Sequence, residues 1–503
     1  RGGCYPKGSA ARRFEKMNPA RHVREAPGST HPLSLDRAAL RLVTVATAVI
    51  VMLSVAWRRH HFLNATLTVA GLNAALLATF ITNEQIPGVM AVTGLLVHDG
   101  YSLFGTAAVL VSTLGCATLA HAYLEGVNDN REEMYLLLLI AAAGAIVLVG
   151  ARHMVSFLIG LELMSIPLYG MVGYIYRDKR SLEASIKYLV LSAAASTFLL
   201  FGMALVYAQT GSLAFASLAG AVQMGAPLVT MGLAMILVGI AFKLSLAPFH
   251  LWTPDVYHGA PAPVGAFLAT VSKIAVLLVL LRWWNTLGLG QTAVFTTLLA
   301  TLAALSILGG NLLALQQSNV KRLLGYSSIA HFGYVLVAII AVNELSDDAV
   351  KVYLLTYMAA TLGAFGVLTL LSSPYRGDDA QGLADLRGLF WQRPFLAAVL
   401  TLSVLSLAGV PLTAGFIAKF YVIATGVKAG LWWLIAALVA GSAIGIYFYL
   451  RVMVTMFLAT PGKRRLDAAR DWGQHSGGIM TVMLALFTLA VGLYPQPLID
   501  LLQ

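Results

Sequence analysis

Residues 242–255 read FKLSLAPFHLWTPD, and residues 405–420 read LSLAGVPLTAGFIAKF. Both runs place the tetrapeptide LSLA before a proline, inside a segment that is otherwise apolar. Proline removes a backbone donor and clashes with the preceding turn, so each segment is predicted to form a helix that is broken near its middle. A lysine lies beside each break, Lys243 in the first and Lys419 in the second. Paired broken helices indicate a membrane protein with two inverted repeats and a site near mid-membrane.

The composition excludes the soluble classes of protein. Of 503 residues, 59% are hydrophobic and only 11% are charged, whereas soluble domains usually carry about a quarter charged residues. A soluble chain of this length would divide into several domains with polar surfaces, and this chain lacks the residues to cover them. An ordinary soluble enzyme, a disordered protein and a secreted disulfide scaffold are therefore excluded. The remaining fold class is all-α, a polytopic membrane protein.

Apolar segments long enough to cross a bilayer recur along the chain. At 1.5 Å per residue, about 20 residues cross roughly 30 Å of hydrocarbon. We predict about fourteen transmembrane helices. They lie near residues 38–57, 62–82, 101–123, 134–151, 154–176, 184–209, 227–254, 261–284, 293–316, 322–342, 349–373, 394–425, 431–457 and 478–494. The apolar but glycine-rich stretch 210–226 is predicted to be a re-entrant or surface segment.

The basic residues are distributed unequally between the loops. Fifteen Lys and Arg residues, including Lys321 and Arg322, fall in one set of alternate loops and four in the other. The richer set is expected in the cytoplasm, and an even number of spans then places both termini on the periplasmic side. Since this bias explains much of the net charge of +11, nucleic acid is not expected as a partner. Residues 1–37 are also basic but lack the apolar core of a signal peptide, so we expect a disordered tail there.

Five ionisable side chains fall deep inside apolar segments: Glu162, Lys187, Lys243, Lys273 and Lys419. A charge at mid-bilayer costs roughly 2.5–3.5 kcal/mol on insertion scales. One carboxylate cannot neutralise four lysines by pairing, so some of the amines must be hydrated, or uncharged part of the time. Groups of this kind can pass protons, which favours a proton relay over a membrane scaffold of inert ion pairs.

Two histidines extend this set. His250 follows the first proline break, and His331 lies within the span predicted at 322–342. Histidine titrates near neutral pH and can relay protons, although a packing histidine held by hydrogen bonds fits either position equally well. The two cysteines, Cys4 and Cys116, have no partner at metal-ligand spacing, and no glycine-rich phosphate loop is found. The chain is therefore expected to hold no metal and no redox centre.

Four runs of sequence carry a family resemblance. They are GLEL at 160–163, RSLEASIKY at 180–188, the broken segment at 242–255 and NVKRLLGYSS at 319–328. Together they resemble the antiporter-like membrane subunits of bacterial respiratory complex I, the proton-pumping NADH:quinone oxidoreductase, and among these the subunit N family. The resemblance extends from about Val51 to the C-terminus. Lys419 favours subunit N, because a related antiporter-like subunit carries glutamate near that position.

The resemblance implies fourteen helices with two inverted five-helix repeats, and proton translocation driven by redox chemistry in other subunits. The family's functional positions match Glu162, Lys187, Lys243, Lys273, Lys419 and His250. The implied organisation is a three-helix segment at 38–133, repeats at 134–284 and 285–457, and a cytoplasmic loop with the last helix at 458–503.

The resemblance also implies partners and a location. The partners are other membrane-arm and peripheral-arm subunits in a bacterial inner membrane, and these would hold FMN, iron–sulfur clusters and quinone. No cofactor is expected on this chain, and NADH-quinone oxidoreductase activity would belong to the whole complex. The alternative is an Mrp-type cation/proton antiporter subunit, which shares the fold. Sodium exchange would favour sites rich in carboxylates, whereas the apolar segments here contain one, Glu162. Neighbouring genes for complex I subunits would separate the two functions.

Overall fold

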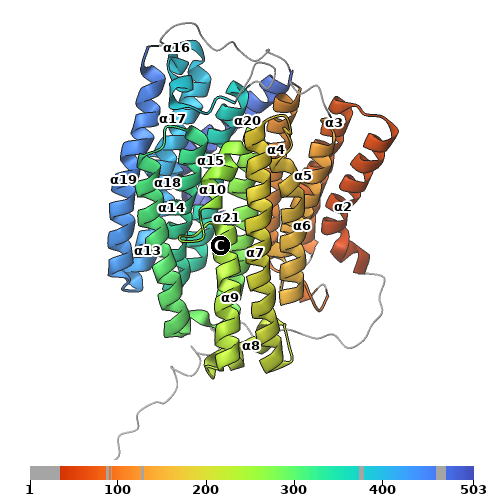
Figure 1. The fold of residues 1–503 in the computed structure, drawn as a ribbon, viewed down its shortest axis with the longest axis vertical. Helices are drawn as coiled ribbons and strands as arrows, with labels where there is room; N and C mark the ends of the chain where they lie inside the picture. The colour runs from red at the N-terminus through yellow and green to blue at the C-terminus, as the bar shows by residue number, and fades with distance from the viewer. Residues whose placement is uncertain are drawn as a thin grey trace, which may run out of the picture.

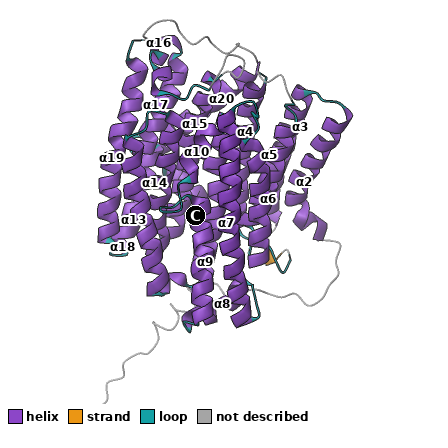
Figure 2. Cartoon of the chain, in the orientation of Figure 1, coloured by secondary structure: helices purple, strands orange, loops and turns teal. Residues whose placement is uncertain are grey.

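The computed structural model describes residues 34–85, 90–91, 93–125, 130–372, 379–459 and 472–502. The chain forms a bundle of helices that run approximately side by side (Figure 1). A two-residue hairpin, β1 (Met90–Ala91) and β2 (Val97–His98), pairs antiparallel with Met90 opposite His98 (Figure 2).

The helices of the first half, in chain order, are α2 (Ser34–Trp57), α3 (His61–Gln85), α4 (Gly100–Leu124), α5 (Glu133–Val149), α6 (Met154–Val172), α7 (Lys179–Thr210), α8 (Phe215–Gln223), α9 (Pro227–Leu244), α10 (Trp252–Gly259), α11 (Ala262–Phe267), the π-helix η2 (Leu268–Ser272), α12 (Lys273–Leu287) and the 3₁₀ turn η3 (Leu289–Gln291). Those of the second half are α13 (Ala293–Leu315), α14 (Val320–Ala341), α15 (Ser346–Leu371), the 3₁₀ turn η5 (Leu383–Leu386), α16 (Leu389–Gln392), α17 (Pro394–Ala408), α18 (Ala414–Lys428), α19 (Trp432–Phe457), α20 (Trp472–Leu493) and α21 (Gln496–Leu502).

The all-helical membrane fold is confirmed. In the part of the chain that the structure describes, eleven helices are long and apolar enough to cross a membrane, and three more are apolar but shorter. Each of the fourteen predicted segments overlaps one of these helices, and the stretch 210–226 contains the nine-residue α8. The number of crossings, the inverted repeats and their boundaries stay predictions. The helix α2 begins at Ser34 and residues 1–33 lie outside the described residues, so the predicted tail at 1–37 stays a prediction.

Both predicted helix breaks are present. The helix α9 ends at Leu244, where Ser245 takes a left-handed conformation with φ of 63°, and the chain resumes helical structure at Trp252. The helix α17 ends at Ala408, and Gly409 has a φ of 79°, which glycine adopts without steric cost. The sequence did not predict a third irregularity, the π-helix η2, which ends immediately before Lys273.

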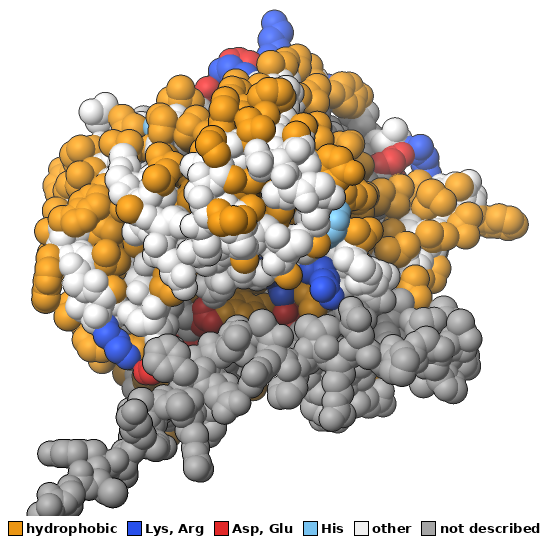
Figure 3. Space-filling view, turned by 90° about the horizontal axis from the view of Figure 1, so that it is seen from below, with side chains coloured by type: hydrophobic (Ala, Val, Ile, Leu, Met, Phe, Trp, Pro, Cys, Tyr) orange, Lys and Arg blue, Asp and Glu red, His pale blue; other side chains and the backbone are white. Residues whose placement is uncertain are grey.

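The bundle has a buried centre and an apolar perimeter. The most apolar stretches of 262–287, α14 and α15 are 100%, 94% and 89% buried, so these helices form the centre. Large hydrophobic side chains are exposed on α2, α3, α7 and α19, for example Leu53, Leu77, Ile186 and Tyr447. Viewed from the end where α8 lies, hydrophobic side chains surround most of the visible rim (Figure 3). An apolar perimeter of this extent suits contact with lipid or with other membrane helices.

A buried ion pair joins the start of α4 to α12. Asp99 caps α4 by accepting a hydrogen bond from the Ser102 N–H, and Arg282 binds both carboxylate oxygens of Asp99. Both side chains are about one-tenth exposed. Burial alone would raise the pKa of Asp99, but the hydrogen bonds and charge of Arg282 outweigh burial and hold the pKa below its usual value. The stabilisation is therefore present above the ordinary pKa of about 4 and is lost as the pH falls below it.

We expect Arg282→Met to destabilise the protein by about 3–5 kcal/mol, because it leaves a buried carboxylate without its cation. The control is Arg59→Met, which removes an exposed pair with Glu133 and should change stability by less than about 1 kcal/mol. The measurement is thermal unfolding of the detergent-solubilised protein at neutral pH. Equal shifts for the two variants would show that the buried pair contributes no more than a surface pair.

Candidate functional site

Lys243 lies in the last turn of α9 and is buried. Its ammonium donates hydrogen bonds to Ser165 Oγ of α6 at 2.8 Å and to Ser192 Oγ of α7 at 2.7 Å. Tyr169 of α6 also donates to Ser192 Oγ, at 2.7 Å. The first predicted lysine thus sits in a cluster of hydroxyl groups between three helices, and hydroxyls can both give and accept a proton.

Glu162 reaches the same cluster from α6. Its Oε1 accepts a hydrogen bond from Ser196 Oγ of α7 at 2.6 Å. Ser196 is four residues from Ser192, and Glu162 is three residues from Ser165, so the serines that bind Glu162 and Lys243 are neighbours on one helix face. The exposed Ile159 and Ile166 flank Glu162 along α6, which places the carboxylate at the edge of the bundle.

Lys187, which is predicted to lie deep inside an apolar segment, is not buried in the bundle. Its side chain is 43% exposed, and its ammonium pairs with Glu183 at 2.7 Å and with Asp255 at 3.0 Å. The reason is the length of α7, which has 32 residues and spans about 48 Å at 1.5 Å per residue. A bilayer core of about 30 Å leaves the first turns of such a helix near the interface. Lys187 and Glu162 therefore have different partners in this structure.

Lys273 is fully buried at the start of α12, directly after the π-helix. Its ammonium donates to the carbonyl oxygen of Leu244 at 2.9 Å and to Ser245 Oγ at 2.7 Å. It also lies 5.0 Å from the centre of the Phe332 ring. Leu244 ends the first half of the first broken helix, so Lys273 binds the carbonyl end of that half-helix, where the helix dipole is negative.

Lys419 makes the equivalent contact at the second break. Its ammonium donates to the carbonyl oxygen of Ala408 at 2.8 Å, and Ala408 is the last residue of α17. It lies 5.1 Å from the centre of the Tyr334 ring. Each broken helix thus offers the carbonyl end of its first half to one buried lysine. Phe332 and Tyr334 are two residues apart on α14, so this helix contacts both lysines.

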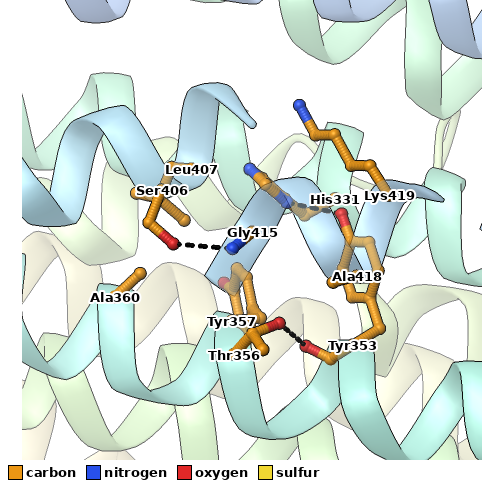
Figure 4. Close-up of a pocket in the computed structure, with 10 residues that line it drawn as sticks. All are labelled: His331, Tyr353, Thr356, Tyr357, Ala360, Ser406, Leu407, Gly415, Ala418 and Lys419. Atoms are coloured by element: carbon orange, nitrogen blue, oxygen red, sulfur yellow. Dashed lines mark hydrogen bonds between the residues drawn. The ribbon is translucent and has the colours of Figure 1, made fainter. Parts of the chain in front are cut away.

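His331 directly precedes Phe332 on α14 and is three residues before Tyr334. Its Nδ1 is 2.6 Å from the Tyr353 hydroxyl of α15, and its Nε2 is 3.1 Å from the Tyr449 hydroxyl of α19. Figure 4 shows His331, Tyr353 and Lys419 at a cavity between α14, α15, α17 and α18. The cavity volume is about 10 Å³, close to the smallest that holds one water molecule. Tyr353 and Tyr449 were not predicted from the sequence. A tyrosine in an apolar segment does not indicate which side chain its hydroxyl will bind.

His250 has different neighbours from Lys243. Its ring lies 6.4 Å from the ring of Tyr326 on α14, whereas Lys243 binds serines on α6 and α7. A shared hydrated cavity for the two residues stays a prediction. In the described ranges, no group of three or more His, Cys, Asp and Glu residues is arranged to hold a metal ion. Cys116 is buried, and Cys4 lies outside the described residues.

Lys321 is more buried than the sequence predicts, whereas Lys187 is more exposed. The sequence placed it in a loop, but it lies in the first turn of α14 and its side chain is 1% exposed. Its ammonium pairs with Asp379 at 2.7 Å and donates to the carbonyl oxygen of Ala260 at 2.7 Å. Ala260 follows the last residue of α10, so a third buried lysine binds a carbonyl at a helix end, here together with a carboxylate.

Comparison with known proteins supports the resemblance. Residues 151–445 match the family described as NADH:quinone oxidoreductase/Mrp antiporter, transmembrane. A protein of Ectopseudomonas mendocina (strain ymp), named NADH-quinone oxidoreductase subunit N, is 56% identical over 468 residues, which cover 92% of this chain and 94% of that protein.

Solved structures agree with this relationship. A chain of respiratory complex I from Thermus thermophilus with bound aureothin is 34% identical, with a TM-score of 0.78 over 92% of this chain and 98% of that chain. Chains of an archaeal membrane-bound sulfane sulfur reductase and of the Mrp complex from Dietzia sp. DQ12-45-1b are 23% and 22% identical, with TM-scores of 0.83 and 0.82. They cover 93% of this chain and 96% of their own chains, and at this identity they indicate a shared fold.

Proposed function

The chain belongs to the NADH:quinone oxidoreductase/Mrp antiporter family and, within it, to the subunit N family of NADH-quinone oxidoreductase, and from this premise we propose a route for its protons. As such a subunit it is an antiporter-like part of a multi-subunit, proton-translocating complex in the inner membrane. The proposed route uses Glu162, Lys243, Lys273, His331 and Lys419, with His250 beside the first break.

The observation that carries this proposal is the paired placement of Lys273 and Lys419. Each ammonium binds an uncharged carbonyl at the end of a half-helix, and His331 lies on the helix that contacts both lysines. An amine held by neutral groups can lose its proton without leaving a buried carboxylate unpaired, which a salt-bridged amine cannot do. The His331–Tyr353 pair and the adjacent cavity supply exchangeable protons between the two halves.

Lys187 has a different role in this proposal. Its ammonium lies in a chain of ion pairs that runs from the Glu183 carboxylate through Lys187 and the Asp255 carboxylate to the Arg322 guanidinium. These side chains are 27% to 63% exposed, so Lys187 is proposed to exchange protons with water near the membrane surface. It is therefore not assigned to the buried relay.

We infer that the energy for transport comes from partner subunits. FMN, iron–sulfur clusters and quinone are proposed to lie there, since the functional groups of this chain are amines, hydroxyls, imidazoles and one carboxylate. The basic loops, which hold fifteen Lys and Arg residues against four in the alternate set, support an orientation with those loops in the cytoplasm and both termini in the periplasm.

Cation exchange of the Mrp type is the second candidate function. Its support is the shared fold of the Dietzia Mrp complex. Hard cations are bound by oxygen ligands such as carboxylates, carbonyls and water, so a sodium site is expected to be rich in oxygen donors. The described site instead contains Lys243, Lys273 and Lys419 with Glu162 at its edge. Proton transport that depends on NADH and not on sodium supports the first function, and sodium-dependent transport without NADH supports the second.

We expect Glu162→Gln to reduce proton uptake per NADH oxidised by roughly tenfold, below the 10² to 10⁴ typical of a direct proton-transfer group. Glutamine keeps the shape and can still accept the hydrogen bond from Ser196, but it removes the charge near the Lys243 cluster. Glu344→Gln, which changes an exposed carboxylate paired with Lys428, is the control and should pump normally. The assay uses inverted membrane vesicles with equal amounts of assembled complex. Normal pumping by Glu162→Gln would exclude Glu162 from the route.

A further inference from the structure

The end of α20 lies directly against the break between α17 and α18. Gly492, in the last turn of α20, faces Leu412 and Thr413 so closely that a Cβ atom on it would overlap the carbonyl oxygen of Leu412. The same Cβ would lie 2.5 Å from Thr413 Cα. Real Cβ atoms do not approach backbone atoms this closely, so only glycine fits this contact.

The break itself has a defined and unusual backbone. Leu412 has a φ of 72°, which is rare for a residue with a side chain, and Thr413 precedes the first residue of α18. Ser406 Oγ of α17 accepts a hydrogen bond from the Gly415 N–H at 3.0 Å. These contacts hold the two half-helices in one relative position.

Residues on both sides of Gly492 in the chain are held by packing and by a hydrogen bond. Ala414, Val491 and Leu498 form a small buried cluster, and Leu355 and Leu502 pack on it. Lys351 of α15 donates a hydrogen bond to the carbonyl oxygen of Leu502 at 2.9 Å. The segment 491–502 is therefore attached to α15, as well as to the break.

The position of Lys419 depends on this backbone. Its ammonium binds Ala408, the residue before Gly409, and a Cβ on Gly409 would lie only 3.1 Å from Lys419 Nζ. Lys419 is six residues after Thr413 on α18. A shift of the turn at 409–413 would move α18 relative to α17 and would separate the ammonium from its carbonyl.

We propose that Gly492 is a positioning residue for proton transfer, and that the segment 491–502 clamps the α17–α18 break so that Lys419 stays on the Ala408 carbonyl. Gly492 does not exchange a proton itself. This inference rests on the proposed function, since it assigns a residue that acts through Lys419.

The test compares two glycine-to-alanine changes on α20. At Gly492 the new methyl group meets the backbone of the break, whereas at Gly478 it meets no atom within 4 Å. We expect Gly492→Ala to reduce proton uptake per NADH oxidised by roughly tenfold, since a 1 Å misplacement of a reacting group can cost up to about a hundredfold. It should also move the pH profile of pumping, because the surroundings of a proton-transfer group change. Gly478→Ala should leave both the ratio and the profile unchanged.

If assembled complex with Gly492→Ala has a normal proton uptake per NADH oxidised and a normal pH profile of pumping, the proposed clamp by segment 491–502 is wrong. A lower ratio with an unchanged pH profile would also overturn it, since a merely structural defect has that effect. If Gly492→Ala does not assemble, Lys351→Met removes the Leu502 contact without crowding the break. Lys351→Met should shift the pH profile of pumping by less than Gly492→Ala would. A wild-type pH profile in Lys351→Met would overturn the proposal. If Lys419→Ala lowers pumping and Gly492→Ala does not, the clamp fails and the proposed function stands.

Discussion

Lys419→Ala is expected to reduce proton uptake per NADH oxidised by roughly a hundredfold, the lower end of what a positioned proton-transfer group contributes. Alanine removes the group that exchanges the proton and leaves the Ala408 carbonyl without its donor. The complex should still assemble, because the lost contact is one hydrogen bond to a neutral carbonyl. The assay is proton uptake by inverted vesicles, normalised to NADH oxidation and to the amount of assembled complex.

Lys419→Glu should lose less pumping than Lys419→Ala. A protonated glutamic acid can donate to a carbonyl as the ammonium does, so the position keeps a titratable group. An ionised glutamate would instead be repelled by the carbonyl end of α17, which explains why some activity should be lost. Near-wild-type ratios in both variants would show that Lys419 is structural. Equal, complete loss in both would show that the positive charge, and not the ability to titrate, is required.

The fold could be predicted in outline from a few sequence features. Proline in two apolar segments predicted the breaks at Ser245 and Gly409, because the loss of a backbone donor is a local effect. The scarcity of polar residues predicted the helical membrane architecture in the same direct way. The π-helix before Lys273 could not be predicted, since residues 268–272 read LATVS and contain neither proline nor glycine.

The surroundings of the lysines were harder to predict than their identity. Lys187 lies in an apolar run but is paired and partly exposed, and Lys321 lies in a basic run but is buried. Burial depends on how far a helix extends beyond the bilayer and on which loop folds over it. Asp379, the partner of Lys321, is 58 residues away in sequence, so no local pattern could reveal the pair.

The buried lysines differ from one another in the charge of their partners. Lys273 and Lys321 are both almost completely buried, and both bind a carbonyl at a helix end. They differ in their second partner, which is the neutral Ser245 hydroxyl for Lys273 and the Asp379 carboxylate for Lys321. Methionine has nearly the volume of lysine but cannot be protonated, so one substitution tests both positions.

We expect Lys273→Met to assemble normally and to lose pumping by roughly a hundredfold, since it removes a proton-transfer group held by neutral partners. Lys321→Met should have the opposite effect. It removes the buried ion pair with Asp379, at a cost of about 3–5 kcal/mol, so less complex should assemble. The complex that does assemble should keep a normal ratio of protons to NADH.

The two measurements are the amount of assembled complex in native gels and the proton uptake of vesicles that contain equal amounts of it. A normal ratio in Lys273→Met would remove this lysine from the route and leave Lys419 without a transfer partner in the first half. A reduced ratio in Lys321→Met would place a salt-bridged lysine on the route. In that case a neutral hydrogen-bond partner would no longer distinguish the lysines that carry protons from those that hold helices together.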